Sequence, residues 1–360
     1  MIHMQPSKPN HRRVLLDVQD IRTIFRSKEG DIIAVEGLSF QLHEGETLAV
    51  VGESGCGKSV TSKTILNILS KNARVTSGKI LFQTDRNNNE VVDILSLPPD
   101  SREMLRIQRL DISMIFQEPM SAFSPVITVG NQIRESAELY LAETAAVNGE
   151  KRPPKAVRRA QNHELMRQFL DLVHLKDEDI GKYYTYNMSG GMRQRAMIAM
   201  ALIGSPKILI ADEPTTALDV TLQAQILDLL NELKEERGMS IIFVTHDLGV
   251  VAEMAQRVLV MYLGKAVEVG TVDQIFYEAK HPYTQALLAS TPTLVGDITE
   301  LEYIEGNVPP AYEMPSGCRF HTRCKMAMEG LCDVVEPVTT IIDEDHEVLC
   351  HLYSGGSDNE

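Results

Sequence analysis

The chain has 360 residues, of which 43% are hydrophobic, and a formal net charge of −15. This length suffices for a large α/β domain followed by a smaller one, and the acidic balance argues against a chain that binds nucleic acid through a basic surface. Five cysteines without an N-terminal apolar segment favour a reducing, cytosolic setting, and no apolar run approaches the roughly 20 residues of a membrane-spanning helix.

The N-terminal part is predicted to be a flexible lead followed by a β layer. Residues 1–13 are polar and contain prolines, so we expect them to be flexible. From Val14 to Leu48, short apolar and polar alternations broken by glycines predict an antiparallel β layer. Phe25 lies in this layer ahead of a turn-prone stretch. Its ring could stack on adenine, or it could be an ordinary packing residue of an edge strand.

A phosphate-binding loop is predicted next. The apolar run Thr47–Val51 predicts a buried strand, and helical spacing is found from Thr61 to Leu69. A glycine-rich loop between a strand and a helix is the context in which G-x-x-x-x-G-K-[ST] binds phosphate. Lys58 would reach the β- and γ-phosphates, and the Ser59 hydroxyl would ligate Mg²⁺. The predicted nucleotide-binding residues here are Gly52, Ser54, Gly55, Cys56, Gly57, Lys58, Ser59 and Val60.

The segment from about residue 120 to about residue 205 is predicted to form an inserted helical subdomain. Helical periodicity occurs at Val129–Leu141 and at Glu164–Val173. Ser189, Gly190 and Gly191 then begin a further helix, and small residues at a helix start are typical of an anion site. Because one phosphate tail does not need two such sites from one chain, we expect these three residues to contact the nucleotide of a neighbouring subunit.

The remaining predicted elements indicate a parallel sheet. Ile208–Ala211 is a continuous apolar run, which is typical of a strand buried on both faces. An amphipathic helix is predicted at Gln223–Glu236, and two more strands at Ser240–Thr245 and Val258–Tyr262. Strands that alternate with helices in this way predict an α/β fold with a parallel sheet.

Polar side chains follow several of these strands. Gln117 comes after a predicted strand at Ile112–Phe116, Asp212 and Glu213 follow Ile208–Ala211, and His246 follows another strand. Ligands of open α/β sheets bind at the carboxyl ends of the strands. We expect Asp212 to bind Mg²⁺ directly or through water, with Ser59 and Gln117 beside it. Glu213 would polarise the attacking water, and His246 would contact the γ-phosphate, although a lone histidine is more often structural.

The C-terminal part differs in composition. Residues 281–360 hold 14 acidic against 3 basic side chains, whereas the first 280 residues hold 36 against 32. We therefore predict one domain over 14–280 and a small region over 281–360. This region carries four cysteines, whose spacing leaves an iron–sulfur cluster, a zinc site and free thiols open. The four cysteines are Cys318, Cys324, Cys332 and Cys350. Three basic residues lie near the first two in sequence and could offset the charge of a cluster: Arg319, Arg323 and Lys325. If one cysteine is not a ligand, His321 and His351 are the possible substitutes.

Six segments together resemble the motifs of an ABC-type nucleotide-binding subunit. In chain order they are Gly52–Ser59, Gln117, Ser189–Met192, Ile208–Glu213, Thr216–Asp219 and His246. Met192 stands where the family usually has Gln, but this is usual in the oligopeptide/dipeptide (peptide/nickel) importer branch. Phe116–Met120 and His281–Leu288 are also similar to that branch. The resemblance covers about residues 14–280.

The resemblance implies a P-loop NTPase core with an N-terminal antiparallel β layer, an inserted helical subdomain and a small cysteine-containing C-terminal region. It implies ATP and Mg²⁺ as cofactors, bound between two subunits of a head-to-tail dimer whose second ATPase subunit is usually a different chain. It further implies two transmembrane permease subunits, contacted near residues 118–130, and an extracytoplasmic peptide-binding protein. The chain would then lie at the cytoplasmic face of the cell membrane, in contact with it through the permeases alone. For the four cysteines the resemblance favours a [4Fe-4S] cluster.

Other functions remain open at this point. The cargo of such an importer could be a dipeptide, an oligopeptide, a nickel complex or another small solute. A non-transport ABC ATPase acting on nucleic acid or ribosomes would be expected to have tandem cassettes and a basic surface, which this acidic chain lacks. A third hypothesis is a redox-responsive regulator in which a cluster controls the use of ATP.

Overall fold

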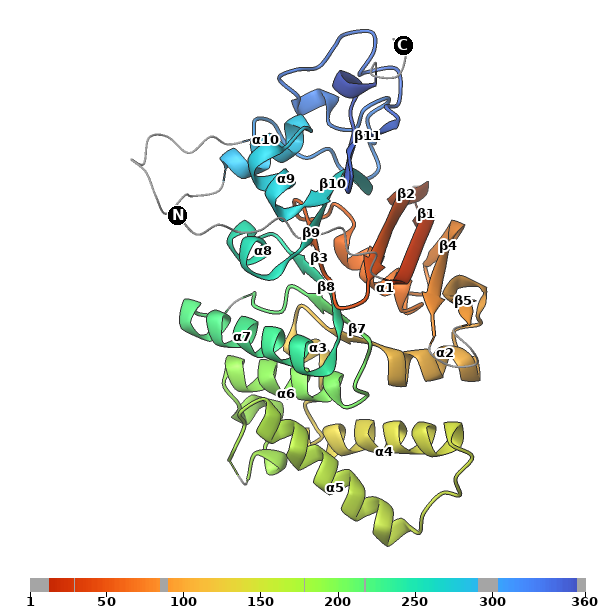
Figure 1. Ribbon diagram of the computed structural model, residues 1–360, viewed down its shortest axis with the longest axis vertical. Helices are drawn as coiled ribbons and strands as arrows, with labels where there is room; N and C mark the ends of the chain where they lie inside the picture. The colour runs from red at the N-terminus through yellow and green to blue at the C-terminus, as the bar shows by residue number, and fades with distance from the viewer. Residues whose placement is uncertain are drawn as a thin grey trace.

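The structure is a computed structural model, and it describes residues 13–28, 30–84, 90–177, 179–216, 218–290 and 304–354. The predicted lead at 1–13 lies outside these residues except for Arg13. Figure 1 shows a helical body at one end of the molecule, two sheets in the middle and the C-terminal region at the other end.

The smaller sheet is antiparallel and has four strands in the order β2-β1-β4-β5. Its alternating pattern buries one face, with Leu16, Val18 and Phe82 in a core that is shared with the larger sheet. The β layer predicted from Val14 to Leu48 is thus confirmed, and strands from later in the chain complete it. The bounds are β1 (Val14–Ser27), β2 (Gly30–His43), β4 (Ala73–Gln83) and β5 (Val91–Asp93).

The larger sheet has eight strands in the order β11-β12-β10-β9-β3-β8-β7-β6. The neighbours from β9 to β6 are parallel, and the C-terminal strands join in antiparallel pairing. Every residue of β3, β7 and β8 is buried, because the smaller sheet packs on one face of these strands and helices pack on the other. The bounds are β3 (Thr47–Val51), β6 (Ile112–Ile115), β7 (Ile208–Asp212), β8 (Ser240–Thr245), β9 (Arg257–Tyr262), β10 (Lys265–Thr271), β11 (Thr339–Asp343) and β12 (His346–Leu349).

The predicted helical insertion is present between β6 and β7. Its two longest helices extend beyond the periodic segments found in the sequence, because α4 continues to Val147 and α5 already begins at Lys155. Apolar side chains of this body, such as Ile133 and Phe169, pack in one core with Leu209 of β7. The body contains α3 (Pro119–Ala122), α4 (Val129–Val147), α5 (Lys155–Leu172) and α6 (Gly190–Leu202). The other helices are α1 (Lys58–Ile65), α2 (Arg102–Arg106), α7 (Val220–Arg237), α8 (Leu248–Met254), α9 (Val272–Glu278) and α10 (Pro282–Ala289).

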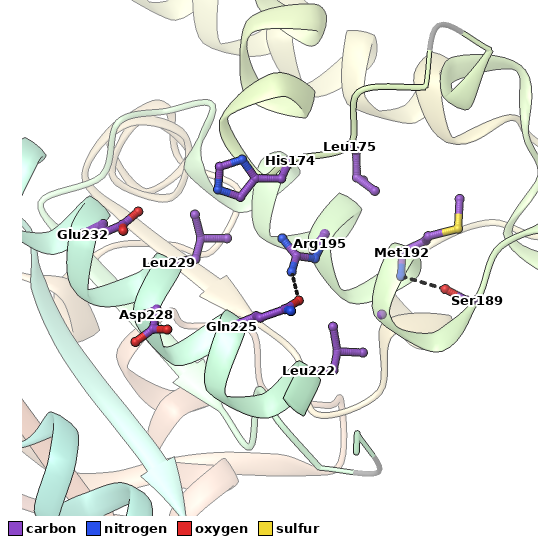
Figure 2. Close-up of a pocket in the computed structure, with 11 residues that line it drawn as sticks. His174, Leu175, Ser189, Met192, Arg195, Leu222, Gln225, Asp228, Leu229 and Glu232 are labelled. Carbon is purple, nitrogen blue, oxygen red and sulfur yellow. Dashed lines mark hydrogen bonds between the residues drawn. The ribbon is translucent and has the colours of Figure 1, made fainter. Parts of the chain in front are cut away.

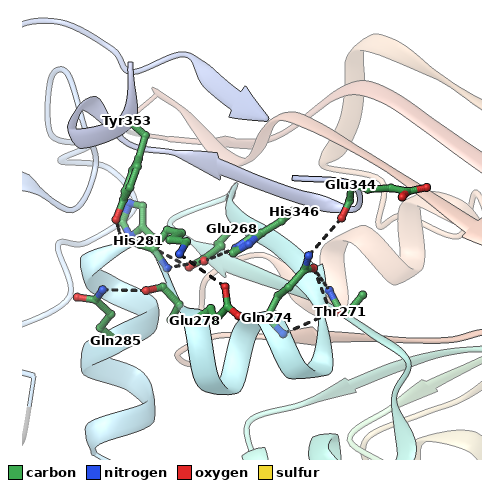
Figure 3. A network of polar contacts seen from close by, with 11 residues as sticks. Glu268, Thr271, Gln274, Glu278, His281, Gln285, Glu344, His346 and Tyr353 are labelled. Atoms are coloured by element: carbon green, nitrogen blue, oxygen red, sulfur yellow. Dashed lines mark hydrogen bonds and ion pairs between the residues drawn. The ribbon is translucent and has the colours of Figure 1, made fainter. Parts of the chain in front are cut away.

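The C-terminal region is attached to the larger sheet across the boundary predicted at residue 280. Strand β12 pairs with β10, and the buried carboxylate of Glu268 in β10 accepts hydrogen bonds from three groups (Figure 3). These are the backbone N–H groups of Lys280 at 2.7 Å and His281 at 3.0 Å, and Nε2 of His346, in β12, at 2.8 Å. The change in composition at residue 280 therefore does not mark a break in the sheet.

Candidate functional site

The glycine-rich loop Gly52–Ser59 connects β3 to α1, as the sequence predicted. Gly57 precedes the helix with φ +106°, and a Cβ at this position would lie 2.6 Å from the carbonyl oxygen of Ala34. A Cβ at Gly52 would lie 2.2 Å from the carbonyl oxygen of Met261. Ser54 and Gly55 are exposed at the tip of the loop. Only glycine allows the backbone to turn this closely, which leaves the loop open toward a ligand.

Lys58 is directed back into the loop. Its Nζ donates to the carbonyl oxygens of Gly52 at 2.7 Å and Glu53 at 3.1 Å, and the residue is 6% exposed. Cys56 lies beneath it, 3.8 Å from Nζ, and burial raises the pKa of this thiol. Val60 is partly buried and packs its side chain against the core shared by the two sheets. The amine of Lys58 is thus held at the place where phosphate oxygens would replace the two carbonyls.

The hydroxyl of Ser59 meets the carboxylate that follows β7. Ser59 Oγ donates to Asp212 Oδ1 across 3.1 Å, although 153 positions separate the two residues. Asp212 is 3% exposed, and burial raises its pKa above the ordinary value against the lowering effect of the Ser59 hydrogen bond and the charge of Lys63. A hydroxyl beside a carboxylate matches the hard oxygen ligands that Mg²⁺ prefers.

Glu213 is the point on which the other predicted side chains converge. Its Oε2 accepts from Gln117 Nε2 at 2.8 Å and from Thr216 Oγ1 at 3.0 Å, and its Oε1 lies 3.2 Å from His246 Nδ1. Its backbone has φ +47°, in the left-handed region, and its N–H donates to the carbonyl oxygen of Val244 at 2.8 Å. Strained backbone of this kind persists where the surroundings hold it in place, which is typical of functional sites.

The surroundings keep Glu213 ionised. Burial acts to raise its pKa, but hydrogen bonds from His246 and Thr216 and the charges of His246 and Lys58 outweigh burial, so the pKa lies below the ordinary value. A carboxylate that stays charged can accept a hydrogen bond from a water molecule and orient it. Thr216 was not among the predicted catalytic residues, although its position three residues after Glu213 is the signal that would have indicated this contact.

Phe25 lies in the smaller sheet. On β1 it is opposite Ile32 of β2 and Ala73 of β4, and its side chain is half-buried. Both interpretations made from the sequence, a ring for adenine and a packing residue, agree with a half-buried aromatic side chain near one end of this sheet. Its role in nucleotide binding therefore stays a prediction.

The Ser-Gly-Gly segment lies apart from the glycine-rich loop. Ser189 caps α6 by accepting a hydrogen bond from the Met192 N–H at 3.2 Å, and Ser189 and Gly190 are exposed. A Cβ at Gly191 would lie 2.3 Å from Leu222 of α7, so this glycine lets the two helices meet closely. Figure 2 shows the cavity of about 650 Å³ between α6 and α7, and none of its lining residues belongs to the glycine-rich loop. In a single chain the two predicted anion sites are thus separate.

The prediction of a metal centre in the C-terminal region is wrong. Among the residues that the structure describes, no group of three or more His, Cys, Asp or Glu side chains could hold a metal ion. The cysteines instead hold the local backbone: Cys318 N–H donates to the Cys332 carbonyl at 2.8 Å, and Cys332 Sγ accepts from the Met328 N–H at 3.4 Å. Burial raises the pKa of Cys350 to about 11, and burial also raises the pKa values of Cys318 and Cys324. A raised pKa favours the thiol over the thiolate, which is the form that a [4Fe-4S] cluster or zinc binds.

Two further expectations depended on that centre. Arg323, which was expected to offset the charge of a cluster, binds Glu53 in the glycine-rich loop instead. Tyr283 also contacts Glu53, through the backbone N–H of that residue at 2.9 Å. Sequence reasoning missed both contacts, because 270 and 230 positions separate the partners and no local pattern links them. A regulator whose cluster controls ATP use loses its basis together with the cluster.

The chain is similar to known families and relatives over most of its length. Residues 35–216 match the family described as ABC transporter, and residues 267–332 match the family described as oligopeptide/dipeptide transporter, C-terminal region. The dipeptide transport ATP-binding protein DppD of Bacillus subtilis (strain 168) is 47% identical over 340 residues, which are 94% of each chain. The oligopeptide transport ATP-binding protein OppD of Salmonella typhimurium (strain LT2) is 44% identical over 92% of this chain and 91% of the relative.

The fold also has a close match among solved structures. The ATP-binding cassette MJ0796, solved as a dimer in a post-hydrolysis state bound to ADP and Pi, superposes with a TM-score of 0.58. The match covers 72% of this chain and 99% of the cassette, at 24% identity. At this identity the likeness concerns the fold alone, and it confirms the predicted α/β P-loop core with its N-terminal antiparallel layer.

Proposed function

The chain belongs to the ABC transporter family, and we propose that it is the ATP-binding and ATP-hydrolysing subunit that powers an importer of di- or oligopeptides. The peptide cargo is supported by the C-terminal match at residues 267–332 and by relatives that are named for dipeptide and oligopeptide transport. The observation that carries the ATPase role is the convergence of Gln117, Thr216 and His246 on Glu213, next to the contact of Ser59 with Asp212.

The glycine-rich loop and the strand ends fit Mg-ATP. At Gly52 and Gly57 a Cβ would collide with backbone carbonyl oxygens, so only glycine permits this loop conformation. Lys58 supplies a positive charge, and Ser59, Gln117 and Asp212 would supply oxygen ligands for Mg²⁺. When bound, Mg²⁺ neutralises charge on the β- and γ-phosphate oxygens. Lys58 leaves the carbonyls of Gly52 and Glu53 and binds the same phosphates. Phosphoryl transfer needs such positioning and charge stabilisation more than covalent catalysis.

Glu213 and His246 position the attacking water. Glu213 is ionised and lies at the end of β7, so its Oε1 accepts a hydrogen bond from the water and draws the oxygen into line with the γ-phosphate. The His246 ring, whose side chain is 63% exposed, turns from Glu213 toward the γ-phosphate when the nucleotide is bound. Gln117 donates to Glu213, so a Gln117 side chain that binds Mg²⁺ would couple nucleotide binding to the carboxylate.

Two segments with exposed residues, 189–190 and 118–130, suit contacts with a second ATPase subunit and with the permeases. Ser189 and Gly190 are free to contact the nucleotide of a second ATPase subunit in a head-to-tail dimer, which we expect to be a different chain. In the segment 118–130, Met120 is 44% exposed and Val126 is 79% exposed, which suits the docking of a permease helix. Within the described residues the structure has no helix long and apolar enough to cross a bilayer. From the relatives named for peptide transport we place the chain at the cytoplasmic face of the membrane, bound to two permeases that receive peptide from a binding protein.

The test combines hydrolysis with uptake. The purified chain should bind and hydrolyse Mg-ATP, and a strain that lacks the chain should lose uptake of a labelled dipeptide. Expression of the wild-type chain should restore uptake, and expression of the Glu213→Gln variant should not. A chain that fails to bind Mg-ATP would disprove the ATPase role. A deletion strain that keeps dipeptide and oligopeptide uptake but loses another solute would reassign the cargo.

A further inference from the structure

Glu53, the second residue of the glycine-rich loop, is held from three directions. Its backbone N–H donates to the Tyr283 hydroxyl at 2.9 Å, and its carbonyl oxygen accepts from Lys58 Nζ at 3.1 Å. Its carboxylate binds Arg323 through two hydrogen bonds, Nη1 to Oε2 at 2.7 Å and Nη2 to Oε1 at 3.1 Å. Tyr283 and Arg323 both come from the C-terminal region, so two of the three contacts are made by residues outside the nucleotide-binding motifs.

The guanidinium of Arg323 is fixed in place. Besides the two bonds to Glu53, Nε donates to the Glu305 carbonyl at 3.1 Å, Nη2 to the Ile304 carbonyl at 3.4 Å and Nη1 to the Tyr262 hydroxyl at 3.4 Å. All five N–H donors of the side chain therefore have an acceptor, and the side chain is only 4% exposed. A planar group with every donor used has one orientation, and it imposes that orientation on the carboxylate that it binds.

Aromatic packing supports the same contact. The rings of Tyr262 and Tyr283 have centroids 4.7 Å apart, and Phe320 packs against them at 5.2 Å and 5.3 Å. Phe320 precedes the short turn that carries Arg323, so this cluster seats the turn against β9 and α10. The hydroxyl of Tyr283 is thereby placed under the loop with the residue fully buried.

We propose that Arg323 is a positioning residue for the phosphate-binding loop. This inference rests on the proposed ATPase function and names the part that the C-terminal region has in it. Arg323 and Tyr283 fix the side chain and the N–H of Glu53, and they thereby fix the carbonyls of Gly52 and Glu53 that hold Lys58. The backbone of the loop is then ordered before the nucleotide arrives, so that only the Lys58 side chain has to move and less conformational entropy is lost when Mg-ATP binds.

The contact is better suited to positioning than to holding the C-terminal region in place. That region has other attachments: β12 pairs with β10, Glu268 accepts from His346, and Arg319 binds Glu36 and the Leu263 carbonyl. Removal of one partner of a buried ion pair is destabilising, because the other charge loses its counter-ion. The other attachments should nevertheless keep the Arg323→Gln variant folded, with a lower unfolding midpoint, while the phosphate-binding loop changes.

The experiment compares Arg323→Gln with Lys325→Gln in the full-length chain. Lys325 is two residues away and 71% exposed, and it makes only a 3.9 Å ion pair with Glu305. For each variant the dissociation constant of Mg-ATP, KM, kcat and the nucleotide-free thermal unfolding midpoint are measured. We expect Arg323→Gln to raise the dissociation constant and KM about ten-fold, with kcat within about two-fold of wild type, and Lys325→Gln to change neither.

Glu53→Gln and the double variant complete the test. If Arg323 acts through Glu53, the double variant binds Mg-ATP no more weakly than the weaker single variant. Arg323→Lys keeps the charge but not the two-pronged geometry, so it should restore only part of the affinity. If Arg323→Gln does not fold, the Glu53→Gln variant alone tests the contact, because it leaves every contact of Arg323 with the C-terminal region in place.

Several outcomes would overturn the inference. Arg323→Gln and Glu53→Gln could bind Mg-ATP as tightly as Lys325→Gln, or the losses of the two single variants could add in the double variant. A lower unfolding midpoint with unchanged Mg-ATP affinity would show a structural role only, and would also overturn it. If the wild-type chain itself does not bind Mg-ATP, the proposed function fails, and this result is distinct from a failure of Arg323 alone.

Discussion

Gln117 Nε2 donates to Glu213 Oε2 across 2.8 Å, although 96 positions separate the two residues. The register of the larger sheet explains this contact. Ile115 of β6 lies opposite Ala211 of β7, so Gln117 and Glu213, each two positions after one of these paired residues, emerge side by side. Asp212 lies opposite Val244 of β8 in the same way, and this brings His246 to the other oxygen of Glu213.

Replacement of Glu213 by Gln should separate ATP binding from hydrolysis. The amide keeps the size of the carboxylate but cannot accept a proton, so we expect kcat to fall by about a hundred-fold or more while Mg-ATP still binds. Steady-state phosphate release and equilibrium nucleotide binding measure the two effects. Glu235→Gln, an exposed position on α7, is the matched control and should behave as wild type. Undiminished turnover in Glu213→Gln would remove this residue from the reaction.

Replacement of Asp212 by Asn should stabilise the nucleotide-free chain at neutral pH and weaken Mg-ATP binding. Because burial raises the pKa of Asp212, the ionised side chain disfavours the folded state. This penalty is present above the folded-state pKa, and it disappears as the pH falls below the ordinary value of an aspartate. The thermal unfolding midpoint of Asp212→Asn should therefore exceed that of wild type at pH 7, and the difference should vanish in acid. A lower midpoint at pH 7 would contradict this account.

Replacement of Gly52 by Ala should displace the phosphate-binding loop. The new Cβ would lie 2.2 Å from the Met261 carbonyl oxygen of β9, so strand and loop must separate, at a cost of about 2–4 kcal/mol in the free energy of unfolding. Gly55→Ala is the control, because Gly55 also has positive φ but has open space around it, and its cost should be about 1 kcal/mol. Urea denaturation measures both. Equal costs would show that the approach of Met261 is unimportant.

Replacement of His281 by Asn should reduce the acid sensitivity of the fold. Burial lowers the pKa of His281 from 6.5 to about 3, so between these values the unfolded chain takes up a proton that the folded chain does not. The folded state therefore loses stability as the pH falls from 6.5 toward 3. Asn keeps an acceptor for the Tyr283 N–H, which donates to His281 Nδ1 at 3.0 Å (Figure 3 shows the surrounding network), and it does not titrate.

The measurement for His281 is the urea midpoint between pH 7 and pH 4. The slope of the midpoint against pH should be shallower in His281→Asn than in wild type. His163→Asn, at an exposed position on α5, is the control and should keep the wild-type slope. If the slopes of wild type and His281→Asn coincide, the buried imidazole does not account for the loss of stability in acid.

Local patterns were sufficient for the elements that form the nucleotide site. The run Thr47–Val51 becomes β3 with the predicted bounds, and the helix predicted at residues 223–236 lies within α7, which ends at the left-handed Gly238. Such elements are predictable because apolar spacing and glycine follow from the geometry of neighbouring residues along the chain. The order of strands and helices also predicted a parallel sheet, and hence the meeting of Asp212, Glu213 and His246 at one edge.

The cysteines show where a pattern of spacing is insufficient. Their spacing left an iron–sulfur cluster, a zinc site and free thiols open, and the family resemblance favoured the cluster, but sequence distance does not determine where each sulfur atom points. In the folded chain Cys332 accepts a backbone hydrogen bond, and burial raises the pKa values of Cys318, Cys324 and Cys350. Metal binding depends on sulfur positions and ionisation, and both depend on packing.

The sequence by itself determined the phosphate-binding loop, the strand-end carboxylates and the type of fold, because each follows from short-range spacing. Only the tertiary structure decided which residues support that loop from behind. The contacts of Arg323 and Tyr283 with Glu53 join residues that are separated by most of the chain, and no periodicity encodes them. They exist because strand order and the packing of Tyr262, Tyr283 and Phe320 bring the C-terminal region against β3 and β9.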